Sequence, residues 1–95
     1  MSKFDLGRLL ATPGALAALE ASGQRPIQFI SRHAQRDWGQ VCAEDGQLND
    51  AALVDGSRLL SAYKTSTGTK LWIITEAADD NGNRAATTIL LPEEY

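Results

Sequence analysis

The C-terminal third of the chain carries the pattern that most constrains the fold. Residues 70–75 alternate apolar side chains on both sides of an extended segment, and two flanking runs, 58–65 and 84–91, have the same period of two. Turns built around Gly68 and Gly82 separate the three runs. We therefore predict three antiparallel strands, with the 70–76 strand in the centre of the sheet.

The N-terminal part predicts helices. The segment Ser2–Asp5 has the form of a capping box, and Leu6, Leu9 and Leu10 follow at helical spacing. Thr12 and Pro13 then suit the cap and first position of a second helix, which Ser22 and Gly23 would end. Two helices, or one kinked helix, are expected before residue 24.

The middle of the chain gives a short strand and one more helix. The run Ile27–Ile30 after Pro26 favours a short buried strand, and Gln40–Gln47 is predicted to be a polar loop. Asn49 is the expected cap of a helix that Gly56 ends. The predicted fold class is α+β, a single domain over residues 1–95, with N-terminal helices packed on a three- to four-stranded antiparallel sheet.

Composition narrows the class of protein. The 95 residues are 43% hydrophobic and 22% charged, as in soluble globular domains, and no apolar run approaches the ~20 residues of a membrane span. We expect a cytoplasmic protein without a cofactor. One cysteine, Cys42, and one histidine, His33, argue against a disulfide or a structural zinc site. The net charge of −3 argues against a general nucleic-acid coat.

The stretch Ser31–Gly39 gathers the only histidine with three charged side chains and a tryptophan. On a helix ending at Gly39, His33 and Asp37 would share a face, so that the carboxylate could orient the imidazole and raise its pKa. Arg32 and Arg36 would lie on the neighbouring face. Such a cluster is either a functional site or a structural cap with Trp38 in the core.

The functional interpretation of this cluster is a metal-independent ribonuclease. The order of elements is similar to that of the barnase, EndoU, colicin and RelE group of small nucleases. That chemistry needs an acid or base near pH 7 and cations that hold phosphate. The residues that would take part are His33 as general base, Asp37 as its partner, and Arg32, Arg36, Lys64 and Thr88 as phosphate-binding groups.

Several segments together resemble a family of short, uncharacterised "plasmid-related" proteins carried by bacterial plasmids and integrative elements. The segments are Ser31–Gly39, Gly56–Tyr63, Leu71–Glu76 and Thr87–Tyr95. The resemblance covers most of residues 27–95 and implies no particular activity. It does imply a mobile-element context.

The interpretation that we prefer from the sequence is a non-enzymatic module. A small acidic protein can have a regulatory role. It can also inhibit a host defence protein or a nucleic-acid-binding protein by occupying the surface of that protein. Arg32, Arg36, Lys64 and Thr88 would then contact a protein partner. The predicted sheet edge at Arg84–Leu91 and the acidic tail Glu93–Tyr95 would suit such a partner, or self-association by strand pairing.

Overall fold

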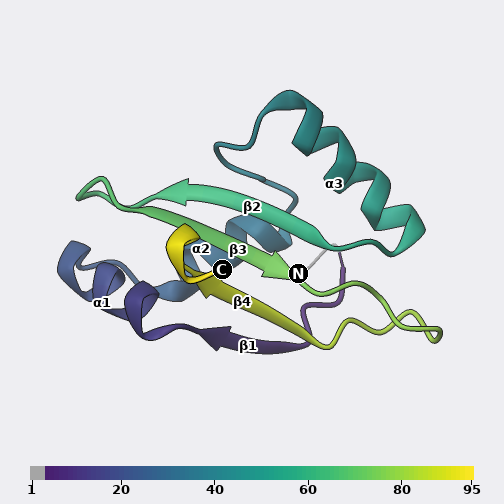
Figure 1. Ribbon diagram of the computed structural model, residues 1–95, viewed down its shortest axis with the longest axis horizontal. Helices are drawn as coiled ribbons and strands as arrows, with labels where there is room; N and C mark the ends of the chain where they lie inside the picture. Colours follow the sequence, from purple (N-terminus) through teal and green to yellow (C-terminus); the bar gives the residue numbers. More distant parts are fainter. Residues whose placement is uncertain (1–3) are drawn as a thin grey trace.

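The computed structural model describes residues 4–95 and shows an α+β fold, three helices and a four-stranded mixed sheet (Figure 1). In chain order the elements are β1 (Arg8–Ala11), α1 (Pro13–Ser22), α2 (Pro26–Ala34), α3 (Ala43–Asp55), β2 (Leu59–Lys64), β3 (Lys70–Thr75), β4 (Ala86–Leu90) and a 3₁₀ turn, η1 (Pro92–Glu94). None of the helices in this described part is long and apolar enough to span a membrane.

The predicted meander is confirmed. β2 pairs with β3 and β3 pairs with β4, both antiparallel, and the turns fall around Gly68 and Gly82 as expected. The predicted core positions are also confirmed, because all five residues are at most 8% exposed: Trp38, Leu59, Leu71, Ile73 and Ile89. Alternation succeeds here because each strand has one face against a helical layer.

The first predicted helix is wrong over its described residues. Arg8–Ala11 forms β1, which pairs in parallel with β4 and extends the sheet to the order β1-β4-β3-β2. The sheet is therefore mixed rather than antiparallel, and Arg84–Leu91 is not an edge, because β4 lies between β1 and β3. Pairing with β4 overrides a helical spacing that is only a few residues long. The Ser2–Asp5 capping box lies partly outside the described residues.

The Thr12–Pro13 helix start is confirmed. Thr12 is extended, its hydroxyl accepts a hydrogen bond from the N–H of Ala15 at 3.2 Å, and Pro13 opens α1. Gly23 ends α1 in the left-handed conformation, with φ 70°. These are local backbone requirements, which is why the sequence alone predicts them.

The predicted strand at Ile27–Ile30 is wrong, because these residues lie in α2. Pro26 occupies the first turn, and the Gln28 side chain accepts a hydrogen bond from the N–H of Arg25 at 2.6 Å. The buried residues of α2 have helical spacing: Phe29, Ile30, His33 and Ala34. A run of four residues cannot separate a strand from a buried helical turn by period alone.

The expected cap at Asn49 is also wrong. α3 begins at Ala43 after Cys42, inside the predicted polar loop, and Asn49 lies in its middle. Asn49 is 4% exposed, and its carboxamide bonds the backbone of Leu60. Gly56 ends α3 as predicted, with φ 84°.

The sheet has two unequal faces. α1 and α2 cover one face and form the main core with Tyr63, Leu71 and Ile73. The other face carries η1, where Tyr95 makes an edge contact with Trp72 at 5.9 Å between ring centroids. The segment Trp38–Gln40 and Asn49 both bond the outer backbone of β2.

Candidate functional site

His33, on α2, lies at the centre of a buried chain of hydrogen bonds between this helix and the sheet. Its Nδ1 contacts the Ser61 hydroxyl, and its Nε2 lies 2.8 Å from the Thr75 hydroxyl. Thr75 lies 2.7 Å from the Thr87 hydroxyl, which donates to the carbonyl of Leu6 at 2.7 Å. The chain joins a helix, three strands and the segment that precedes β1. Its side chains are all fully buried.

The carbonyl of Leu6 at the end of this chain fixes the direction of the bonds as far as Nε2 of His33. Because the carbonyl of Leu6 can only accept, Thr87 donates to it and accepts from Thr75. Thr75 then accepts from the Nε2–H of His33, which leaves Nδ1 to accept from Ser61 in the neutral ring. The arrangement therefore requires a proton on Nε2 of His33.

The surroundings of His33 favour the same neutral form. Burial, and secondarily the charge of Arg84, lowers the pKa of His33 to about 4. Phe4 and Trp38 cover the ring with edge contacts at 5.3 and 5.6 Å between centroids. A histidine that is closed to solvent and has both nitrogens engaged is placed as a structural group.

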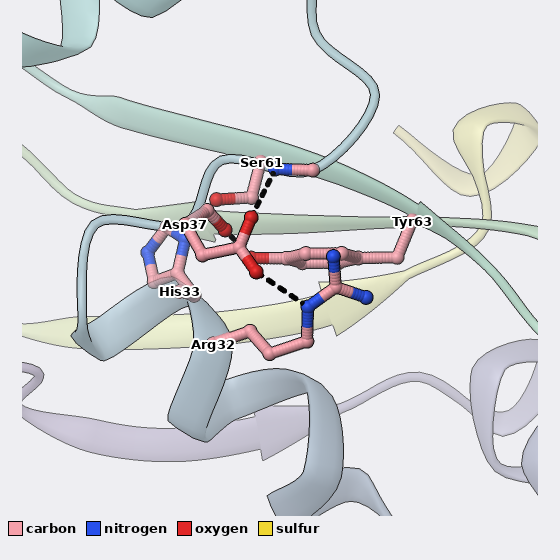
Figure 2. Close-up of polar contacts among 6 residues, drawn as sticks. Arg32, His33, Asp37, Ser61 and Tyr63 are labelled. Carbon is pink, nitrogen blue, oxygen red and sulfur yellow. Dashed lines mark hydrogen bonds and ion pairs between the residues drawn. The ribbon is translucent and has the colours of Figure 1, made fainter.

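Asp37 does not pair with His33, so the predicted His33/Asp37 pair is wrong. α2 ends at Ala34, and Arg36 has a left-handed φ of 68°, so the four-residue spacing no longer puts the two on one helix face. Asp37 instead accepts from Arg32 Nε at 2.7 Å (Figure 2). This bond with Arg32 is the main reason why the pKa of Asp37 is lowered.

The Arg32–Asp37 pair sits on Tyr63 and holds the turn after α2. The Arg32 guanidinium lies 4.7 Å from the centre of the Tyr63 ring, and the Tyr63 hydroxyl donates to the Asp37 carbonyl at 2.5 Å. Asp37 also accepts from the N–H of Gly39 at 3.2 Å. Figure 2 shows Arg32, Asp37 and Tyr63 converging. Burial raises the pKa of Tyr63 to about 12, so this hydroxyl remains a donor.

The remaining predicted phosphate- or partner-binding residues do not converge. Arg36 forms an ion pair with Asp50 of α3 at 3.8 Å. Lys64 is at the end of β2, opposite Lys70, and alternation from Ser61 places its side chain on the sheet face opposite His33. Thr88 follows Thr87 and lines a cavity on that opposite face, beside η1. The sheet thus separates Lys64 and Thr88 from His33.

Arg84 is a buried charge that no sequence motif marks. Its guanidinium, in a side chain that is 6% exposed overall, donates to three backbone carbonyls, those of Ser57, Glu76 and Ala52, at 2.7 to 3.0 Å. These bonds tie the end of α3 to β3. The role of Arg84 is therefore to join backbone segments.

An open apolar groove lies instead between β1 and α2. It has a volume of about 380 Å³ and is lined by apolar residues of both elements and of β4: Leu9, Leu10, Ala11, Pro26, Ile27, Ile30 and Ile89. Leu9 and Ile27 are 52% and 55% exposed. Sequence reasoning missed this site because it assigned Leu9 to a helix. The usable signal was a short apolar run between Gly7 and Thr12, which also fits a strand.

Comparisons with known proteins add no assignment to these sites: no family model, curated protein or solved structure matches the chain. The resemblance to plasmid-related proteins therefore stays a prediction. Within residues 4–95, no cluster of three or more histidine, cysteine or acidic side chains is arranged to hold a metal ion.

Proposed function

We propose that the protein is a non-enzymatic protein-binding module that accepts an extended segment of its partner as an added strand on β1. The observation that carries this proposal is the combination of an unpaired sheet edge and an apolar groove at one place. In Figure 1, β1 runs along the border of the fold, and no helix or strand of the drawn ribbon lies on its outer side.

The backbone of β1 supplies the pairing groups. In its parallel pairing with β4, the N–H of Arg8 donates to Ala85 and that of Thr12 donates to Ile89, both at 3.0 Å. Residues of a strand alternate in direction, so Leu9 and Ala11 direct their N–H and C=O groups away from β4. Among residues 4–95, no other strand pairs with them there. A partner strand would satisfy these groups.

The groove supplies the selectivity. Leu9 and Ala11 are opposite Thr87 and Ile89, so their side chains lie on the face that α2 covers. An added strand would place every second side chain on that face, between β1 and Ile27. The groove is lined by apolar residues, so the partner segment should carry an apolar side chain at alternate positions.

The His33 region supports a binding module over the ribonuclease alternative. His33 is fully buried, and the cations and hydroxyl expected around it lie on two faces of the sheet. Electrostatic stabilisation of a phosphate needs those groups to converge on one point. The ribonuclease alternative therefore lacks the converged site that its chemistry requires.

The test is capture of partner protein by the immobilised chain. Leu9→Pro removes an outward N–H that β4 does not use, and Ile27→Glu places a charge at the groove rim. Both should abolish capture, whereas Val54→Ser on α3, where Val54 is 90% exposed, should not. Thermal melts establish that each variant is folded.

Two results would overturn the proposal. Capture that persists in Leu9→Pro and Ile27→Glu would place binding away from this edge. Capture lost after nuclease treatment of the lysate, or RNA cleavage by the wild-type chain, would indicate a nucleic-acid function instead.

A further inference from the structure

We infer that the strand accepted by β1 is β1 of a second copy of this chain. This inference rests on the proposed function, because it requires the β1 edge to accept a strand. Two copies related by a two-fold axis through Leu10 would join their four-stranded sheets into one continuous sheet. Three observations on β1 and its neighbours support this occupant over an unrelated strand.

The first is that the free backbone groups of β1 are self-complementary. In an antiparallel pair, two residues exchange both hydrogen bonds at every second position. With Leu10 on the two-fold axis, Leu9 of one copy lies opposite Ala11 of the other, and these are the residues whose backbone groups point outward. The register thus forms both exchanging pairs and leaves no outward group of Leu9 or Ala11 unbonded.

The second is the side chain at the axis. Leu10 would face its own counterpart in a non-hydrogen-bonded pair, where opposing side chains approach most closely. Leu10 is 42% exposed, although it is a large apolar residue in a strand. Pairing would cover it on one face of the sheet and cover Leu9 on the other.

The third is charge. In this register Arg8 lies opposite Thr12 of the second copy, and alternation puts both side chains on the face of Leu10. The Thr12 hydroxyl donates to Glu94 at 2.5 Å, and Glu94 also accepts from the N–H of Gly14 at 3.1 Å. Glu94 is thereby held beside Thr12, within reach of Arg8 from the second copy. Arg8 has no ion pair within the described chain.

The two-fold axis repeats this contact, so a dimer contains two Arg8–Glu94 pairs. A carboxylate has lone pairs left after accepting the bonds from Thr12, Gly14 and the N–H of Leu91. An unrelated apolar strand would bury Leu10 equally well but would leave both Arg8 and Glu94 without a charged partner. The charge arrangement therefore favours a second copy.

The experiment measures the mass of the full-length chain by sedimentation over a range of concentrations. Wild type should be a dimer. Arg8→Glu and Glu94→Arg should each raise the dissociation constant at least about tenfold, because each homodimer would contain two like-charge pairs. An equimolar mixture of the two variants should recover dimers, since the mixed pair places opposite charges at both contacts.

Controls separate association from folding. Glu94→Arg also removes a helix-capping carboxylate, so its melting temperature is measured, and Leu9→Pro serves as a second disrupting variant that keeps both charges. Val54→Ser on α3 should leave the dimer unchanged. A dimer that resists Leu9→Pro, or variants whose mixture fails to recover dimers, would overturn the inference.

The outcome also separates this inference from the proposed function. A wild-type chain that remains monomeric at millimolar concentration overturns the second copy as occupant. If the Leu9 and Ala11 amides of that monomer gain protection from hydrogen exchange when a captured partner binds, strand addition at β1 stands. If neither association nor capture depends on Leu9, both the inferred dimer and the proposed strand addition at β1 are wrong.

Discussion

The Asn49 carboxamide pairs with both backbone groups of Leu60, donating to its C=O at 2.7 Å and accepting from its N–H at 3.0 Å. A side chain from α3 therefore takes the place that a further strand would occupy beside β2. The next outward position is closed in the same way: the N–H of Ala62 donates to the carbonyl of Trp38 at 3.1 Å, and its C=O accepts from Gln40 at 2.6 Å. The β2 edge is thus largely satisfied within the chain.

Replacing Asn49 with Ala should lower the free energy of unfolding by about 1–3 kcal/mol, because two partly buried backbone groups of Leu60 lose their partner. The same substitution at an exposed helix position would lower the free energy of unfolding less, since Ala is a better helix former than Asn. Urea denaturation of wild type and Asn49→Ala measures the change. Leu48→Ala, at a neighbouring position of α3 that is 65% exposed, is the control and should change stability little. Equal effects of the two variants would contradict the assigned role.

Stability should depend on pH through His33. Its pKa is lowered from 6.5 to about 4 on folding, so between these values the unfolded chain binds a proton that the folded chain does not. The contribution of neutral His33 is complete above pH 6.5 and is lost as the pH falls to about 4, with a limit on the order of 3 kcal/mol. His33→Gln, which does not titrate, should flatten this part of the profile. If the stability of wild type and that of His33→Gln change in parallel between pH 6.5 and 4, His33 is not the source of the pH dependence.

The contribution of the buried hydrogen bonds to stability can be tested on the sheet. Thr75→Val keeps the β-branched shape but leaves the Nε2–H of His33 without an acceptor, and should cost about 1–3 kcal/mol. Thr88→Val, on the opposite face of β4, makes the same chemical change outside the chain of hydrogen bonds and should cost less than about 0.5 kcal/mol. Denaturation curves compare them, and a Thr88→Val effect as large as that of Thr75→Val would count against a stabilising role for the buried chain of hydrogen bonds.

Two glycines in similar left-handed conformations should respond differently to alanine. A Cβ at Gly39 (φ 73°) would lie 2.0 Å from the Ala62 carbonyl oxygen, whereas one at Gly23 (φ 70°) meets nothing within 4 Å. Gly23→Ala should therefore cost only the conformational penalty of about 1–2 kcal/mol. Gly39→Ala must also displace the Trp38–Gln40 segment from β2, so a clearly larger loss is expected in thermal melts. Equal losses would mean that the close approach to Ala62 is easily relieved.

Local signals explain what could be predicted from the sequence. Thr12–Pro13, Gly23 and Gly56 act on the backbone next to them, and the alternation of 70–75 reports a strand with a covered face, so these features were predicted correctly. Asn49 has equally good capping chemistry, but its partner is Leu60, which lies on another element. A sequence pattern shows that a side chain can bond, not which backbone it will meet.

The errors at the candidate site have the same origin. The spacing of His33 and Asp37 implied contact only while a helix joined them, and the positive φ of Arg36 breaks that condition. β1 is stabilised by β4, which lies near the other end of the chain. The groove and the buried chain of hydroxyls both depend on that long-range pairing, so the sequence offered only the short apolar run before Thr12 as a signal for the groove and none for the hydroxyls.

The contrast between the two borders of the sheet limits how large an assembly can become. A sheet that is open on both sides can add neighbours without end, as in fibrils. Here Asn49 and the Trp38–Gln40 segment block the β2 side, so addition through β1 uses up the only free border among residues 4–95. Under the inferred pairing, growth would stop at two chains, and β1 would be a contact that closes on itself rather than a seed for polymerisation.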